Sequence, residues 1–312
     1  NVFASVGSNI LNALKLSKYV DLGIKRNQKY ELLIHLAPIV TLFLYNATTV
    51  IFTSLDQVML GFIKANESVG YYSAAIKIQN ILVSLITALG AVMLPKISYV
   101  LKNEGRKNFE QMIRKSFEFI IISAIPMCFL IIILAKEIIV VLAGKDYLPA
   151  IPMLQFLMPS LIFIGLSSVT AWQLLIPLGK EKYTVIGALA GVIVNLGLNS
   201  LMIPALGGVG AAVASTLAEL AVLSVHVKAL KDIVSRTFEK RELLIAISST
   251  LIASGVVLVM KYNILVKVAF FACVVYGVLF VGVYGVLLLL FREKLASETL
   301  DSLKTMVIRK RG

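Results

Sequence analysis

Polar and charged side chains recur inside long apolar segments of this sequence, and their spacing gives the first functional hypotheses. Residues of the segment 69–94 show polar side chains at steps of four and three, so these side chains share one helical face. The face carries Ser73, Lys77, Asn80, Ser84 and Thr87. A polar stripe of this length is typical of a helix that lines water, a substrate or another polar helix. We expect it to line a cavity.

A carboxylate lies shortly before this stripe. Asp56 is ten residues before the expected turn near Asn66, and Lys77 is eleven residues after it. Two antiparallel helices would place both residues at a similar depth, where they could pair. The pair is either structural, or Lys77 contacts an anionic substrate and Asp56 is its partner in the resting state. Tyr45 shares a helical face with Asp56 and joins the predicted cavity.

A second carboxylate lies near the middle of the segment 208–228. Glu219 falls at helical spacing with Ser215 and with His226, which is about two turns away. A carboxylate and a histidine inside the membrane could carry a proton or bind a cation, so both are candidates for ion coupling. The alternative is that Glu219 makes a hydrogen bond at a contact between helices.

Small residues and amides recur every four residues in the segment 183–203. They are Gly187, Gly191, Asn195 and Asn199. Small side chains allow two helices to approach closely, and amides form hydrogen bonds between helices in a membrane. We therefore expect this face to pack against another helix.

The composition of the chain indicates that membrane-spanning helices position these polar residues. The 312-residue chain is 59% hydrophobic and only 15% charged, whereas a soluble domain carries about 25% charged residues. The apolar residues form blocks of about 20, which is the length that crosses a bilayer as a helix. A soluble enzyme and a disordered chain are excluded. Eight spans are predicted, at 34–63, 69–94, 116–142, 151–176, 183–203, 208–228, 243–261 and 265–291.

Alternate loops differ strongly in charge. One set, which includes the C-terminus, carries 24 basic residues, and the opposite set carries 5. The positive-inside rule therefore places the basic loops and the C-terminus in the cytoplasm. The same rule explains the net charge of +13 without a nucleic-acid partner.

Residues for chemistry or for a cofactor are not apparent. The sequence shows no Ser-His-Asp pattern, metal-ligand cluster or phosphate loop, and Cys128 and Cys273 lie in apolar segments without a disulfide framework. We expect transport, not catalysis, with neither cofactor nor metal. Because the chain begins at Asn1 with a weakly apolar stretch, we expect it to be part of a longer protein.

Four motifs carry a family resemblance. They are SLDQVMLG at 54–61, VGYYSAA at 69–75 followed by Lys77, QLLIPLGKEK at 173–182, and GGVGAAVAS at 207–215 preceded by Asn195, Asn199 and Pro204 and followed by Glu219. In this order and spacing the chain resembles the bacterial polysaccharide and lipid-linked oligosaccharide flippases of the multidrug/oligosaccharidyl-lipid/polysaccharide exporter superfamily.

The resemblance implies an all-α, polytopic membrane bundle, with about eight full transmembrane helices and a partial one. Residues 1–30 would end a preceding helix and form a basic loop, residues 31–230 would be the C-terminal six-helix lobe, and residues 231–312 would add two helices and a cytoplasmic tail. It also implies the cytoplasmic (inner) membrane as location, and an oligosaccharide on polyprenyl pyrophosphate as substrate, flipped by alternating access. Polysaccharide assembly proteins are implied partners, and Lys77 would offer a point charge to the pyrophosphate or to an acidic sugar.

Three other functions remain to be compared with this one. A multidrug cation antiporter of the same superfamily would favour an acidic cavity, against which Lys77 argues. A membrane polysaccharide polymerase or ligase would need catalytic residues in a sizeable outer loop, and the outer loops are short. A structural scaffold would not explain the polar stripes.

Overall fold

The computed structural model describes residues 54–64, 66–264 and 266–297, together with a few single residues before position 54. The chain divides into a unit Asn1–Val40 and a unit Thr41–Gly312, and every feature below belongs to the second unit. The predicted partial helix and basic loop of residues 1–30, most of the predicted span 34–63 with Tyr45, and the tail after residue 297 lie outside the described residues.

Seven apolar segments of the described chain are helices long enough to cross a membrane. Without water in the hydrocarbon, a backbone can satisfy its polar groups there by forming a helix. The elements are α3 (Asn66–Asn103), α4 (Arg106–Leu142), α5 (Ala150–Leu157), α6 (Ser160–Ser168), η3 (Val169–Leu175), α7 (Lys182–Leu206), α8 (Gly208–Ala229), α9 (Lys231–Thr237), α10 (Lys240–Asn263) and α11 (Ala269–Leu290), with a short 3₁₀ turn at Lys145–Tyr147. The predicted spans from 69–94 to 265–291 correspond to these helices, and the all-helical membrane fold is confirmed.

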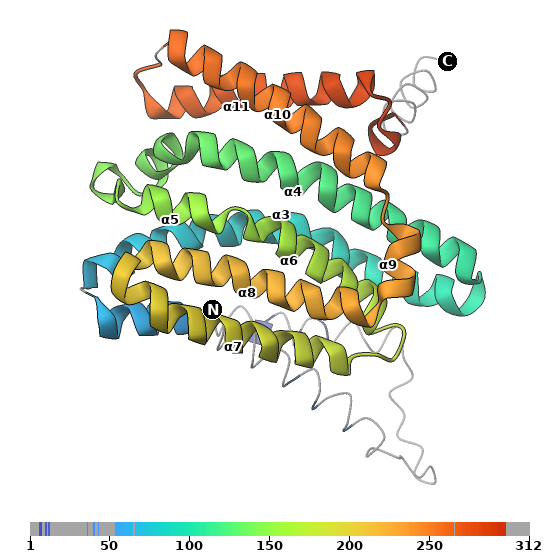
Figure 1. The fold of residues 1–312 in the computed structure, drawn as a ribbon. Helices are drawn as coiled ribbons and strands as arrows, with labels where there is room; N and C mark the ends of the chain where they lie inside the picture. Colours follow the sequence, from blue (N-terminus) through green and yellow to red (C-terminus); the bar gives the residue numbers. More distant parts are fainter. Residues whose placement is uncertain are drawn as a thin grey trace. The chain divides into compact units, whose positions relative to one another are not determined.

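The helices pack in a consistent order across this unit. Figure 1 shows α10 and α11 beside α4, then α3, α5 and α6, and then α8 and α7. One core joins α3, α4, α5, α6 and α8 through large buried side chains, among them Tyr72, Phe109, Ile120 and Leu154. A second core joins α10 and α11 to α4 through Leu134, Tyr276 and Phe280. The polar site described below lies where α3, α7 and α8 meet.

One of the seven segments is not a regular helix. Segment Ala150–Leu175 is divided into α5, α6 and the π-helix η3, and the first division falls at Pro159, which has no N–H group to donate. Thr216 of α8 donates a hydrogen bond to the carbonyl oxygen of Phe156 beside this division (2.7 Å), and Gln79 of α3 donates to Ser160 (2.6 Å). Polar side chains of α3 and α8 therefore donate hydrogen bonds to acceptors on both sides of this division. These bonds also connect α3 and α8 to the divided segment.

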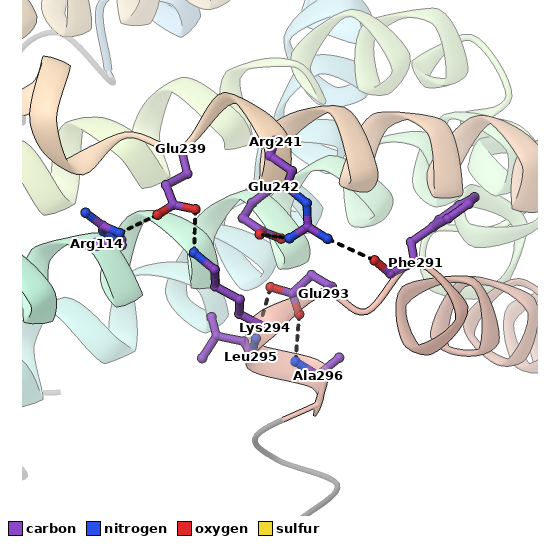
Figure 2. Close-up of polar contacts among 9 residues, drawn as sticks. All are labelled: Arg114, Glu239, Arg241, Glu242, Phe291, Glu293, Lys294, Leu295 and Ala296. Carbon is purple, nitrogen blue, oxygen red and sulfur yellow. Dashed lines mark hydrogen bonds and ion pairs between the residues drawn. The ribbon is translucent and has the colours of Figure 1, made fainter.

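Polar contacts attach α10 and α11 to the rest of the unit at both ends of the spans. At one end, Lys261 of α10 pairs with Glu137 of α4 (2.9 Å) and donates to the carbonyl oxygen of Ile133 (2.9 Å). At the other end, Glu239 between α9 and α10 accepts hydrogen bonds from Arg114 of α4 and from Lys294 (2.6 Å), as Figure 2 shows. The two C-terminal helices are therefore fixed to α4 by charge as well as by their apolar core.

The α7–α8 pair gives a test of close packing. Gly207 lies at the turn between the helices with φ of 58°, and a Cβ atom on Gly210 would lie 2.6 Å from the carbonyl carbon of Met202. We predict that Gly210→Ala destabilises the protein by about 1–3 kcal/mol, because backbone atoms of α7 would have to move. Gly197→Ala is the matched control, since nothing lies within 4 Å of its Cβ position. Thermal unfolding in detergent would measure both, and equal melting temperatures for the two variants would contradict the packing.

Glu239 gives a test of pH dependence. The hydrogen bond from Lys294, assisted by the charges of Lys294, Arg114 and Arg241, lowers the pKa of Glu239 below its ordinary value of 4.5. Its contribution to stability is therefore present above that value and is lost as the pH falls through the lowered pKa. We predict that Glu239→Gln flattens the loss of thermal stability between about pH 6 and pH 3, whereas Glu104→Gln, an exposed control, leaves it unchanged. An acid profile that is the same in Glu239→Gln and in the unaltered protein would refute the role of this ion pair.

Candidate functional site

The carboxylate of Asp56 is the centre of a buried polar cluster. The side chain is only 2% exposed, although it lies in an apolar helix that spans Ser54–Ile63. One carboxylate oxygen accepts hydrogen bonds from the amides of Asn195 (2.8 Å) and Asn199 (2.6 Å). The other accepts from the hydroxyl groups of Tyr72 (2.7 Å) and Ser215. Four neutral donors therefore surround one buried negative charge.

These donors come from three different helices. Tyr72 lies near the start of α3, Asn195 and Asn199 are one turn apart on α7, and Ser215 lies on α8. The spacing of four residues on α7 points both amides toward the same carboxylate, and Asn199 also donates to the side-chain oxygen of Asn195 (2.9 Å). The cluster thus joins the helix Ser54–Ile63 to α3, α7 and α8.

A cavity of about 370 Å³ borders this cluster. Its lining residues are Ser54, Asp56, Gln57, Tyr72, Ile76, Gln79, Asn80, Val83, Leu157, Ile164, Ser215 and Glu219. Glu219 is partly exposed to the cavity, and among the described residues it has no hydrogen-bond partner. The described lining therefore contains two carboxylates and no lysine or arginine.

The Asp56 cluster has the chemistry of a site for a small cation. Its negative charge is met by neutral groups alone within the described chain, and the side-chain oxygen of Asn199 is buried without a partner. Carboxylate, amide and hydroxyl oxygens are the ligands of hard cations. The residues present therefore fit a proton or a hard monovalent cation such as Na⁺, with Asp56, Asn195, Asn199 and Ser215 as the groups that would hold it.

Lys77 lies on a different part of α3 from the Asp56 cluster. Its side chain is exposed, as are those of Asn80 and Ser84, whereas Ser73 is partly buried. Within the described residues, Asp56 bonds to the four neutral donors and makes no ion pair with Lys77. Of the predicted cavity residues, Asp56 and Asn80 line the cavity, while Lys77, Ser73 and Ser84 do not. Asn80 belongs to both the cavity and the exposed polar face.

Glu219 and His226 lie on the same helix but in different environments. Glu219 lines the cavity, whereas His226 is 1% exposed and its Nδ1 atom lies 3.0 Å from the hydroxyl of Thr170 in η3. The ring edge of His226 lies against Gly187, where a Cβ atom would be 2.8 Å from Nε2. The structure therefore places His226 in the packing between α8, η3 and α7, away from the cavity lining.

The four residues expected to pack helices divide into two groups. Gly187 and Gly191 lie against α8, and a Cβ atom on Gly191 would be 2.7 Å from a methyl group of Val222. Asn195 and Asn199 instead bond to Asp56. The regular spacing of four residues along α7 gave no sign of this difference between the glycines and the amides.

Two residues of the Asp56 cluster are not among the site residues predicted from the sequence. Tyr72 and Ser215 each stand in a motif of the family resemblance, and Ser215 also shares a helical face with Glu219. The signal that could have found them is the presence of hydroxyl groups at the depth of Asp56. Depth alone does not tell which side of a helix faces a partner.

The comparisons with known proteins agree with this fold. Residues 2–152 match the model of a family described as polysaccharide biosynthesis protein. A probable low-salt glycan biosynthesis flippase of Haloferax volcanii, Agl15, is 25% identical over 65% of the chain, and an uncharacterized membrane protein of Methanocaldococcus jannaschii is 23% identical over 77%. The alignments cover 43% and 48% of those proteins, so the chain spans about half the length of the curated relatives it matches.

Solved structures show the same architecture. The lipid II flippase MurJ in an inward closed conformation matches with a TM-score of 0.70 and 20% identity, over 86% of this chain and 58% of MurJ. An outward-facing multidrug resistance transporter of the MATE family matches with a TM-score of 0.56 and 13% identity, over 83% of this chain and 65% of the transporter. The chain is thus a multi-pass membrane protein with the fold of these transporters, and the family match over residues 2–152 and the similarity to Agl15 support its resemblance to polysaccharide flippases.

Proposed function

We propose that the protein to which this chain belongs flips polyprenyl-pyrophosphate-linked oligosaccharides across the cytoplasmic membrane by alternating access. Residues 31–230 would form the C-terminal lobe, residues 231–312 the two added helices and tail, and residues 1–30 the end of a preceding helix with its loop. The basic loops and the C-terminus would face the cytoplasm. The family match and the flippase among the relatives support this function, and no part of the proposal requires catalysis.

The exposed polar face of α3 carries the proposal. Lys77 lies eleven residues after the start of α3, which is about 17 Å along the helix and near half the thickness of the hydrocarbon. A lysine there is costly if it faces lipid. The exposed side chains of Lys77, Asn80 and Ser84 are therefore suited to face a wet path, where the ammonium group can attract the pyrophosphate.

The cavity favours one alternative function. Asp56 and Glu219 are acidic, and the described lining holds no basic residue, which suits a multidrug/cation antiporter of the same superfamily. The two functions place different residues in contact with the cargo. A flippase needs Lys77 for its anionic cargo, whereas an antiporter of cationic compounds needs Asp56 and Glu219 and tolerates the loss of Lys77.

The first test is export of the glycan. In a strain that lacks its own flippase, the full-length protein should restore lipid-linked oligosaccharide to the outer leaflet, and Lys77→Ala should reduce export about tenfold or more, because a contact to a charged group is removed. Lys96→Ala, on the same helix beyond the apolar part of α3, is the control and should export normally.

Three results would contradict the flippase proposal. They are absence of export by the unaltered protein, normal export by Lys77→Ala, and equal losses in Lys77→Ala and Lys96→Ala at equal amounts in the membrane. Extrusion of a cationic dye that Lys77→Ala retains and Glu219→Gln loses would establish the antiporter instead.

The second test addresses energy coupling through Asp56. We predict that Na⁺ raises the melting temperature of the detergent-solubilised protein above that in N-methylglucamine chloride, and that Asp56→Asn abolishes this shift, because the charge that would hold the cation is removed. Binding at 100 times the dissociation constant would contribute about 2.7 kcal/mol. Asp146→Asn, at an exposed position, should keep the shift. A shift that persists in Asp56→Asn would place the cation elsewhere, and no shift in the unaltered protein would exclude Na⁺ at this site.

A further inference from the structure

The cavity beside the Asp56 cluster is lined by polar groups that the cluster does not use. Four donors already occupy the two oxygens of Asp56, so this carboxylate is not the group that is left for a ligand. Gln57, Asn80 and Glu219 line the same cavity, and within the described part of the chain none of them has a hydrogen-bond partner. One carboxylate and two amides are therefore available to a molecule in the cavity.

The rest of the cavity suits a small organic group. Its volume of about 370 Å³ is far more than a bare cation fills, and it lies within the range of about 300–1,000 Å³ that is typical of small-molecule pockets. Apolar side chains form much of the wall, namely Ile76, Val83, Leu157 and Ile164. Apolar walls with a few converging polar groups are the usual construction of such a pocket. Because the described lining has two carboxylates and no lysine or arginine, an anionic group would be repelled.

The available polar groups both accept and donate hydrogen bonds. The carboxylate of Glu219 accepts, while the amides of Gln57 and Asn80 each offer an oxygen and an NH₂ group. The hydroxyl groups of a sugar match this set, since each of them donates one hydrogen bond and accepts others, and the C–H groups of the ring can pack on the apolar walls. An alkylammonium group can only donate, so it would leave the amide N–H groups without acceptors.

Asn80 connects the cavity to the exposed polar face of α3. It follows Lys77 by three residues, so the two side chains are neighbours on the helix surface, about 4.5 Å apart along the axis. The side chain of Asn80 is exposed and also lines the cavity. In a lipid-linked oligosaccharide the first sugar is bonded directly to the pyrophosphate. A pyrophosphate held by Lys77 would therefore bring that first sugar beside Asn80.

We propose that this cavity binds the first sugar of the cargo and selects a neutral sugar against an acidic one, with Glu219 as the residue that determines the selection. The proposal rests on the proposed function, because Lys77 must hold the pyrophosphate. A uronic acid would bring a third carboxylate beside Glu219 and Asp56, and like charges brought together at a poorly hydrated site are costly. The selection concerns the first sugar alone.

Binding of short-chain cargo analogues to the detergent-solubilised, full-length protein tests this proposal. The probes are farnesyl pyrophosphate alone and farnesyl pyrophosphate linked to glucose, galactose, N-acetylglucosamine, glucuronic acid or galacturonic acid. Each uronic acid differs from its parent hexose by one carboxylate. Titration calorimetry should show that at least one neutral sugar raises the affinity about tenfold over farnesyl pyrophosphate alone, as a hydrogen bond to a charged group would, and that neither uronic acid raises it.

Glu219→Gln is the decisive variant, because it keeps the shape of the side chain and removes its charge. The ratio of neutral-sugar to uronic-acid affinity should fall about tenfold, while the affinity for farnesyl pyrophosphate alone stays unchanged. Glu67→Gln, exposed in the first turn of α3 and outside the cavity lining, is the control and should keep the ratio. If Glu219→Gln does not fold, Asn80→Ala at its exposed position replaces it and should lose the advantage of the neutral sugars.

The outcomes separate this proposal from the proposed function. Neutral sugars that add no affinity, or an unchanged ratio in Glu219→Gln, would overturn the sugar pocket and leave the contact of Lys77 with pyrophosphate intact. Farnesyl pyrophosphate that does not bind, or that binds equally well to Lys77→Ala, would contradict the proposed function and the sugar pocket with it. A glucosamine probe that binds most tightly and loses this advantage in Glu219→Gln would make the cavity a site for a cationic group, which would also overturn the proposal.

Discussion

A carboxylate inside hydrocarbon must find its partners within the protein, and this constraint organises the centre of the structure. Asp56 lies on an apolar helix and is almost completely buried. Its two oxygens take four hydrogen bonds from side chains on α3, α7 and α8. If the four segments separated, the carboxylate and its donors would lose their partners inside hydrocarbon, where water cannot replace them. This cost holds the four segments in one relative position. The cavity beside Asp56 exists because these helices meet there.

The same constraint gives the charged groups of the described spans different surroundings. Donors without charge surround Asp56 inside the unit, ionic groups gather at the ends of α10 where Lys261 and Glu239 are bonded, and Lys77 is exposed on α3. Lysine and arginine can reach the edge of the hydrocarbon along their own side chains, so ion pairs at the ends of spans cost less than one at the middle. The exposed position of Lys77 is therefore the exception that calls for a functional explanation.

Most of the fold was predictable from the sequence, and the arrangement of the site was not. Hydropathy defines the spans because each apolar block must be about as long as the bilayer is thick. It does not define how a helix is rotated about its axis. From their depth alone Asp56 and Lys77 could pair, whereas in the described residues Asp56 turns toward Asn195 and Asn199 and Lys77 is exposed. Nor does hydropathy reveal the π-helix η3, which depends on contacts between helices.

The separation of Asp56 from Lys77 bears on how a transporter of this kind could couple a cation to its cargo. A cation at Asp56 would compete for the oxygen that Tyr72 now bonds, and Tyr72 is on α3, five residues before Lys77. Tyr72 and Lys77 share one helix, so a change in that bond that moved α3 would also move the exposed polar face, without contact between cation and cargo. Asn80 strengthens this argument, because it lines the cavity and belongs to the exposed face at once. In the proposed flippase, α3 is therefore the element through which the two sites would communicate.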